Sequence, residues 1–282
     1  MGTSSRQTAF VLSGGASLGA IQVGMLHALY EREIEPDLIV GASAGALNGA
    51  FIAARPQNLA TVAELAEIWI GLRRGKVFPL NPLTGLFGFA GLRRHMVPDS
   101  GLRALIHQHL TTERLEELRV PLHVVATDVL TGSEVRLSEG PLVEAILAST
   151  AIPGVLPSVD WEGRELIDGG VANNTPISHA VELGAQRIYV LSTGQTCELE
   201  AAPQGALGMF LHATNLLVQR RLVDDILRYR DAVELIVLPP PCPIRVQLMD
   251  FSQAESLIAE ALDESRRFLT ARGRASRAEL LV

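Results

Sequence analysis

The stretch "IVGASAGALNGA", residues 39–50, places Ser43 between an apolar segment and an alanine-rich segment. The apolar side predicts a β-strand over residues 37–40, and the alanine-rich side predicts a helix over residues 44–54. The letters from Gly41 to Gly45 form the pattern G-x-S-x-G. On a sharp strand-to-helix turn, this pattern exposes the serine hydroxyl and holds the residue in a strained backbone conformation. The alternative is a serine N-cap flanked by glycines that serve packing alone.

A glycine-rich turn lies upstream, in "FVLSGGASLGAIQVGMLHAL", residues 10–29. Hydrophobic patterning predicts a strand over residues 9–13 and a helix over residues 18–31. A dinucleotide-binding loop fits poorly, because Gly14, Ala16 and Gly19 only approximate G-x-G-x-x-G and no acidic residue ends the second strand. A tight structural turn and a cradle of amides for an anion remain as alternatives.

A serine that attacks an ester carbonyl needs such a cradle. The attack creates an oxyanion, and each preorganised N–H donor lowers the barrier by about 2.7–4 kcal/mol. We therefore expect the backbone amides of Gly14, Gly15 and Ala16 to form an oxyanion hole. Glycines at these positions would allow the positive φ values that turn successive N–H groups the same way.

The base that would activate Ser43 could be a histidine or an aspartate. None of the seven histidines has a sequence context that marks it as catalytic, although a triad of Ser43, Asp168 and either His179 or His212 is formally open. An α/β-hydrolase, however, places several strands before its nucleophile, whereas one strand–helix unit precedes Ser43 here. Asp168 ends a short apolar run in "LIDGGVANNTP", 125 residues after Ser43. A structural Asp-Gly-Gly turn is the alternative there.

Composition limits the other classes of function. The 282-residue chain carries a net charge of −7, so it lacks the basic surface typical of nucleic-acid binding. It has no apolar run of about 18 residues and no signal-peptide core, so we expect a cytoplasmic protein without a transmembrane segment. Cys197 and Cys242 are expected to be ordinary thiols.

Short apolar runs alternate with helical patterns along the chain, which predicts an α/β fold with a mostly parallel sheet. No shift in composition marks a boundary, so residues 1–282 are predicted to form a single domain. Residues 75–98 break the pattern with glycines, prolines, apolar side chains and a basic rim. They are interpreted as a lid or loop insertion, either in peripheral contact with a membrane or folded over the core.

Taken together, these motifs resemble the patatin-like phospholipases, which are serine lipid acyl hydrolases. The resemblance extends over about residues 8–195. It rests on the glycine-rich segment Ser13–Gly19, the elbow Gly41–Gly45, the stretches "ATDVLTG" and "ASTAIPGVLPSV", and Asp168-Gly169-Gly170. The family commonly has an arginine where this chain has Leu18.

The resemblance implies a three-layer α/β/α fold, with residues 204–282 as closing helices and strand. It also implies a Ser43–Asp168 dyad without cofactor or metal, in which Ser43 is the nucleophile and Asp168 the base. Gly19, Gly41, Gly45, Gly169 and Gly170 would support the site. We expect burial to raise the pKa of Asp168.

The implied reaction is cleavage of a carboxylic ester in a lipid, of phospholipase A or lysophospholipase type, through an acyl-enzyme. A small-substrate esterase or thioesterase, a related acyltransferase and a catalytically silent scaffold remain as alternatives. The oligomeric state has no signature in the sequence.

Overall fold

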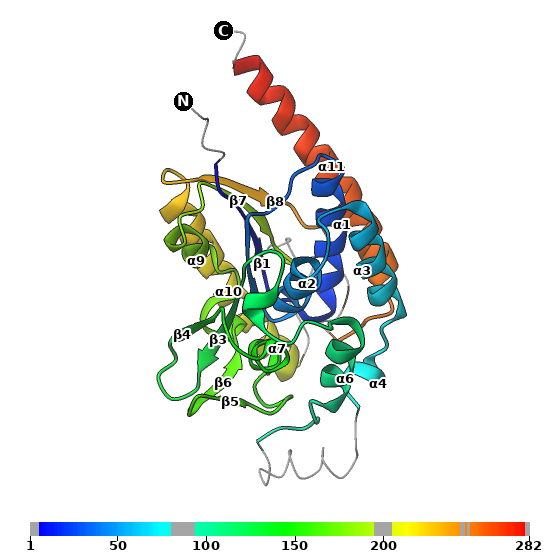
Figure 1. The fold of residues 1–282 in the computed structure, drawn as a ribbon, viewed down its shortest axis with the longest axis vertical. Helices are drawn as coiled ribbons and strands as arrows, with labels where there is room; N and C mark the ends of the chain where they lie inside the picture. Colours follow the sequence, from blue (N-terminus) through cyan, green and yellow to red (C-terminus); the bar gives the residue numbers. More distant parts are fainter. Residues whose placement is uncertain (1–5, 80–93, 195–204, 243–245, 247–248, 280–282) are drawn as a thin grey trace.

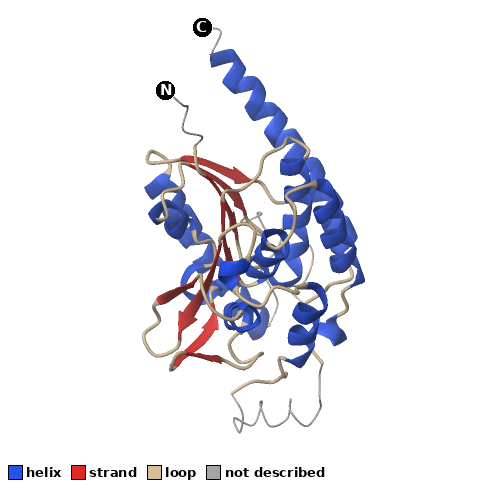
Figure 2. Cartoon of the chain, viewed as in Figure 1, coloured by secondary structure: helices blue, strands red, loops and turns tan. Residues whose placement is uncertain are grey.

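The structure, a computed structural model, describes residues 6–79, 94–194, 205–242, 246 and 249–279. Its centre is a β-sheet, drawn in red in Figure 2. The sheet has eight strands in the order β5-β6-β3-β2-β1-β7-β8, with β4 paired to β3. Strands β1 (Thr8–Leu12), β2 (Leu38–Ala42), β3 (Leu122–Asp128), β7 (Arg187–Leu191) and β8 (Glu234–Leu238) run parallel to one another. Strands β4 (Glu134–Leu137) and β6 (Arg164–Asp168) are antiparallel to β3, and β5 (Val159–Trp161) is antiparallel to β6.

Helices cover both faces of this sheet (Figure 1). On one face, α1 (Gly19–Tyr30) packs against α3 (Leu59–Gly71) and α11 (Ala254–Glu279). On the other face, α9 (Ile177–Glu182) packs against α10 (Ala206–Tyr229) and against β1, β2 and β7. The three-layer α/β/α fold with a mostly parallel central sheet is therefore confirmed.

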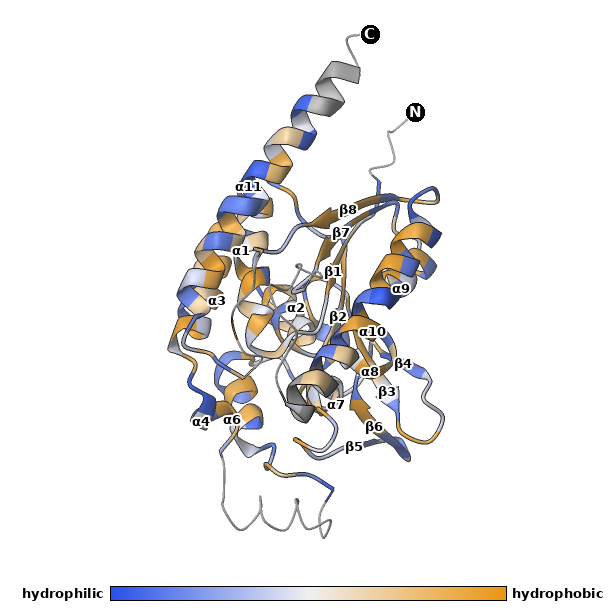
Figure 3. Cartoon of the chain, turned by 180° about the vertical axis from the view of Figure 1, so that it is seen from behind, coloured by the Kyte–Doolittle hydropathy of each residue, from blue (hydrophilic) through white to orange (hydrophobic). Residues whose placement is uncertain are grey.

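The side chains of β1 explain why the sheet lies in the middle. Because successive residues of a strand point to opposite faces, Phe10 and Leu12 join one apolar cluster while Ala9 and Val11 join the other. All four are fully buried. A strand covered on both faces is apolar throughout, as the orange strands of Figure 3 show.

The described residues also form several shorter helices. They are α2 (Ala44–Ala53), α4 (Arg74–Val77), α6 (Ser100–His109), α7 (Leu142–Thr150) and α8 (Gly170–Asn173), together with 3₁₀ turns at Ala16–Leu18 and Leu115–Glu117. The described helices include none that is both long and apolar enough to cross a bilayer.

Two sequence expectations meet the structure only in part. Of the proposed lid, residues 75–98, the stretch 80–93 lies outside the described residues, so the lid and the single-domain organisation stay predictions. Cys242, expected to be an ordinary thiol, is disulfide-bonded in the structure, so that expectation was wrong; Cys197 lies outside the described residues.

Candidate active site

Sheet register brings Ser43 and Asp168 to the same level. Ala42, the last residue of β2, is opposite Val125 of β3, and the next residue of β3, Ala126, is opposite Asp168. Ser43 follows Ala42 directly, and Asp168 ends a strand that runs the other way. Two residues distant in sequence therefore reach the same level of the sheet, at the ends of β2 and β6, the two strands that flank β3.

Ser43 occupies a strained turn between β2 and α2. Its φ is 51° and its ψ is −123°, and positive φ is unusual for a residue with a side chain. The close approach of strand and helix depends on glycine at two positions. A Cβ at Gly41 would lie 2.6 Å from the Gly45 carbonyl oxygen, and one at Gly45 would lie 2.1 Å from the Leu12 carbonyl oxygen. The G-x-S-x-G pattern thus has a steric basis here.

The hydroxyl of Ser43 donates a hydrogen bond to Asp168 Oδ2 over 2.7 Å. The amide of Gly170 donates to the other carboxylate oxygen, Oδ1, over 2.7 Å. Burial raises the pKa of Asp168 to about 6, although the hydrogen bonds from Ser43 and Gly170 act in the opposite direction. The expected upward shift is confirmed, and the carboxylate is a stronger base than an exposed aspartate.

Ser149, at the end of α7, supports both residues and was not singled out from the sequence. Its Oγ accepts a hydrogen bond from the Ser43 amide at 2.9 Å and donates to the Val125 carbonyl at 2.6 Å. Its carbonyl accepts from the Gly169 amide at 3.2 Å, immediately after Asp168. This serine belongs to the stretch "ASTAIPGVLPSV", so that stretch fixes the turn at Ser43 relative to the loop after Asp168.

The loop after β1 lies against Ser43, since a Cβ at Gly14 would be 3.0 Å from Ser43 Cβ. The Gly14 amide donates to the Asn174 carbonyl over 3.0 Å, so it is engaged in the structure. The amides of Gly15 and Ala16 show no acceptor among the described residues. A left-handed φ occurs at Ala16 (48°), whereas Gly15 is extended with a φ of 171° and Gly14 is not left-handed either, contrary to the expectation. Leu18, which replaces the family's common arginine, is buried.

An apolar pocket opens beside Ser43 and Ala16. It holds about 800 Å³ of empty space, its open mouth included. Its apolar lining includes Leu47, Phe51, Leu65, Trp69, Leu105 and Phe251. The described lining contains no Asp, Glu, Lys or Arg, so the pocket suits a hydrocarbon group better than a charged one.

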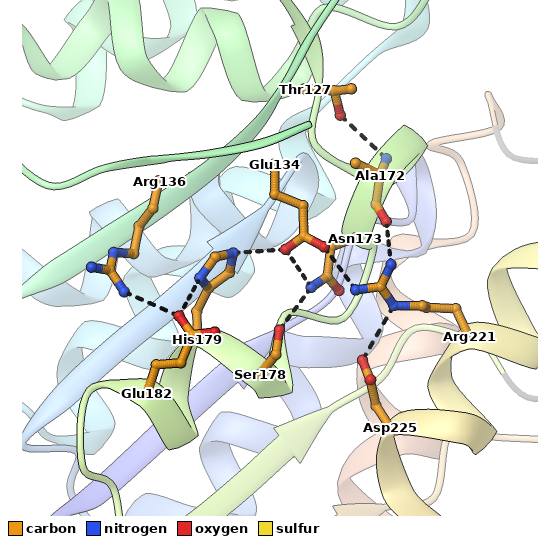
Figure 4. Close-up of polar contacts among 10 residues, drawn as sticks. All are labelled: Thr127, Glu134, Arg136, Ala172, Asn173, Ser178, His179, Glu182, Arg221 and Asp225. Carbon is orange, nitrogen blue, oxygen red and sulfur yellow. Dashed lines mark hydrogen bonds and ion pairs between the residues drawn. The ribbon is translucent and has the colours of Figure 1, made fainter. Parts of the chain in front are cut away.

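His179, one member of the formal triad, points elsewhere (Figure 4). Its Nε2 lies 2.8 Å from Glu134 Oε2, and Arg221 of α10 pairs with the other oxygen of Glu134 at 2.7 Å. Arg221 also donates to the Ala172 carbonyl in α8. Burial alone would raise the pKa of Glu134, but hydrogen bonds from His179, Asn173 and Arg221 lower it to about 2. This network braces the segment that follows Asp168.

Gly19 and Gly169, which were predicted to support the site, lie where a side chain would clash with neighbouring residues. Gly19 begins α1 beneath the Trp69 ring, and Gly169 packs on the backbone of Val125. His212 lies on α10, and the Ser43 hydroxyl bonds to Asp168 instead. The described ranges hold no group of three or more His, Cys, Asp or Glu side chains that could bind a metal ion.

Comparisons with known proteins agree with this geometry. Residues 10–181 match the family described as patatin-like phospholipase. Patatin-like phospholipase domain-containing protein 7 of Mus musculus is 29% identical over 203 residues, covering 70% of this chain and 14% of the relative. An uncharacterized NTE family protein of Mycobacterium tuberculosis is 31% identical over 192 residues, covering 68% of this chain and 50% of the relative. The chain thus spans half or less of the length of these relatives.

Among solved structures, VipD from Legionella pneumophila aligns with 92% of this chain and 67% of its own, at 16% identity and a TM-score of 0.43. The type III effector protein ExoU aligns with 95% of this chain and 53% of its own, at 14% identity and a TM-score of 0.39. The family match covers more than half of the chain and contains the serine elbow, the glycine-rich loop and Asp168. On that basis, the chain belongs to the patatin-like phospholipase family.

Proposed function

We propose that this chain is a lipid acyl hydrolase of phospholipase A or lysophospholipase type. The observation that carries the proposal is the 2.7 Å hydrogen bond from Ser43 Oγ to the buried Asp168 carboxylate, beside an uncharged apolar pocket. Such a pair fits nucleophilic catalysis, because a serine hydroxyl needs an adjacent base. Membership of the phospholipase family supports a lipid ester as the substrate class.

In the proposed acylation step, Asp168 accepts the Ser43 proton as Oγ attacks the ester carbonyl carbon. The carbonyl oxygen becomes an oxyanion, which the amides of Gly15 and Ala16 stabilise. The tetrahedral intermediate then expels the alcohol, which takes the proton from Asp168. The acyl group remains on Ser43 as an ester, with its hydrocarbon chain in the apolar pocket.

Deacylation repeats these steps with water as the nucleophile. Asp168 accepts a proton from water as its oxygen attacks the acyl-enzyme carbonyl. Collapse of the second tetrahedral intermediate releases the fatty acid and returns the proton to Ser43 Oγ. Neither step uses a metal ion or an organic cofactor.

A fluorophosphonate probe tests the nucleophile assignment. We expect the probe to label the wild-type protein at Ser43, and the Ser43→Ala variant to stay unlabelled. Folded wild-type protein that is not labelled would contradict the assignment and favour a silent scaffold.

Substrate class is tested by comparing fatty-acid release from phospholipid and lysophospholipid vesicles with hydrolysis of soluble short-chain esters. A preference for the vesicles supports the lipid hydrolase, and a preference for short-chain esters supports a small-substrate esterase. Peripheral membrane contact through residues 75–98 stays a prediction, because residues 80–93 lie outside the described chain.

A further inference from the structure

The peptide group between Ser13 and Gly14 is fixed at both ends. The Ser13 carbonyl accepts a hydrogen bond from Gln22 Nε2 at 2.7 Å, and the Gly14 amide donates to the Asn174 carbonyl at 3.0 Å. Ser13 and Gln22 are buried, so water does not compete for these bonds. The start of the loop after β1 is therefore rigidly placed.

The next peptide group, between Gly14 and Gly15, is held at its carbonyl end. Thr193, which follows β7, donates its hydroxyl to the Gly14 carbonyl at 2.5 Å, and Asn174 Nδ2 donates to the same oxygen at 3.3 Å. Thr193 is also buried, and its amide donates to Ser13 Oγ at 2.9 Å. A Cβ at Gly15 would lie 2.3 Å from Thr193 Oγ1, so the loop packs directly on this side chain.

Because the peptide group is planar, the hydrogen bond to the Gly14 carbonyl also determines the orientation of the Gly15 amide. The carbonyl of one residue and the amide of the next lie in one plane and point in opposite directions in a trans peptide. A hydroxyl that holds the Gly14 carbonyl therefore also fixes the direction of the Gly15 N–H, which points away from Thr193. This amide has no acceptor among the described residues, whereas the preceding one is satisfied by Asn174.

We infer that Thr193 is a positioning residue that aims the Gly15 amide at the oxyanion of the ester reaction. The inference rests on the proposed function, because an oxyanion arises only if Ser43 attacks an ester. Thr193 does not touch the substrate in this account; it acts through the Gly14–Gly15 peptide group. It also lies beyond residues 10–181, the part of the chain that matches the family.

A buried polar chain continues from this loop to the wall of the apolar pocket. Gln22 Oε1 accepts from Asn48 Nδ2 at 2.8 Å, and Asn48 Oδ1 accepts from Trp69 Nε1 at 2.8 Å. Asn48 and Trp69 line the pocket. The loop is thus anchored from the segment after β7 on one side and from the pocket wall on the other. Of the two side chains that hold the Gly14 carbonyl, Thr193 makes the shorter hydrogen bond.

The decisive variant is Thr193→Val, which removes the hydroxyl and keeps the shape of the side chain. Thr193→Ser restores the hydroxyl without the methyl group. The matched control is Thr61→Val, because Thr61 is also buried but its hydroxyl bonds to the Pro56 carbonyl, at the start of α3. Each variant is assayed for kcat and KM on a fatty-acyl p-nitrophenyl ester, and for stability in urea.

We expect Thr193→Val to lower kcat by about 10- to 100-fold, less than outright loss of an oxyanion donor costs, with KM changed less than about twofold. Thr193→Ser and Thr61→Val should retain kcat within about threefold. A trifluoromethyl ketone provides a second readout. When Ser43 Oγ adds to its carbonyl carbon, the proton passes to Asp168 and the ketone oxygen becomes the oxyanion. Its affinity should fall by the same factor as kcat/KM in Thr193→Val.

The outcomes separate this inference from the function on which it rests. An active wild type together with a folded Thr193→Val variant that keeps its kcat and ketone affinity overturns the inference alone. Equal losses in Thr193→Val and Thr193→Ser overturn it as well, because they would show that the methyl group and not the hydroxyl matters. A wild type that neither hydrolyses esters nor reacts with fluorophosphonate overturns the proposed function, and the inference with it.

Discussion

The hydroxyl of Ser43 and the carboxylate of Asp168 share a 2.7 Å hydrogen bond although 125 residues separate them in sequence. If this pair carries the reaction, neither partner can be replaced. We expect Ser43→Ala and Asp168→Asn each to lower kcat/KM by at least about 1,000-fold. Urea unfolding, monitored by circular dichroism, is the control for folding. A folded Asp168→Asn variant with full activity would show that another group acts as the base.

The pKa of Asp168 sets the expected pH profile. Only the ionised carboxylate can accept the Ser43 proton, and burial raises its pKa to about 6. We therefore expect kcat/KM to be constant above about pH 7 and to fall about tenfold per pH unit well below pH 6. Steady-state kinetics measured from about pH 3.5 to about pH 8 test this expectation, with circular dichroism as the control for folding at the acid end. An acid limb near pH 4, where an unburied aspartate titrates, would contradict it.

The apolar pocket predicts a chain-length effect. Leu105 of α6 lines the pocket and is partly buried. A larger side chain at this position would therefore fill space in which we propose that the acyl chain binds. We expect Leu105→Trp to lower kcat/KM for a long-chain ester by about tenfold or more and to leave an acetyl ester nearly unchanged. Leu59→Trp, an exposed position at the start of α3, is the matched control. Equal loss on both esters would mean that the pocket does not hold the chain.

Gly45 and Gly71 allow the steric need for glycine to be distinguished from the general effect of replacing a helical glycine by alanine. A Cβ at Gly45 would lie 2.1 Å from the Leu12 carbonyl oxygen, whereas one at Gly71 would meet nothing within 4 Å. We expect Gly45→Ala to lower the free energy of unfolding by about 1–3 kcal/mol. Gly71→Ala, at the end of α3, should raise it by about 0.5–1 kcal/mol. Urea denaturation measures both, and similar values for the two variants would refute the steric explanation.

His179 distinguishes the dyad from a triad. Because its Nε2 faces Glu134, replacement by glutamine should leave kcat within about threefold of the wild-type value. The lost contact should lower the free energy of unfolding by about 1–2 kcal/mol, since the partner carboxylate is partly buried. Kinetics and urea unfolding of His179→Gln measure the two effects. A loss of kcat comparable to that of Asp168→Asn would instead support a catalytic triad that includes His179.

Hydrophobic periodicity closely predicted the strands and helices that flank the glycine-rich loop and Ser43. The strand expected over residues 9–13 is Thr8–Leu12, and the helix expected over residues 44–54 is Ala44–Ala53. The turns at Ala16–Leu18 and Gly170–Asn173 carried no such signal, because each is only three or four residues long. The second of them is held by tertiary contacts, such as Arg221 on the Ala172 carbonyl.

In the candidate site, too, some residues could be predicted from the sequence and others could not. Ser43 and Asp168 lie in short local patterns that a sequence displays directly. Ser149 and Thr193 act through hydrogen bonds to residues 106 and 179 positions away, so no local spacing could identify them. The engagement of the Gly14 amide by Asn174 is equally long-range. Motifs therefore indicate the residues that we propose to react, while the contacts that orient these residues emerge only when the strands are assembled.

The packing of α1 against α11 has a consequence for shortened versions of the chain. A Cβ at Gly24 would lie 2.3 Å from the Ile258 carbonyl oxygen, so the two helices touch almost backbone to backbone. A fragment cut after residue 181 would lose α11 together with β7, which pairs with β1. The back of α1 and the open side of β1 would then face water. We expect such a fragment to aggregate on expression, even though it contains every residue of the family match.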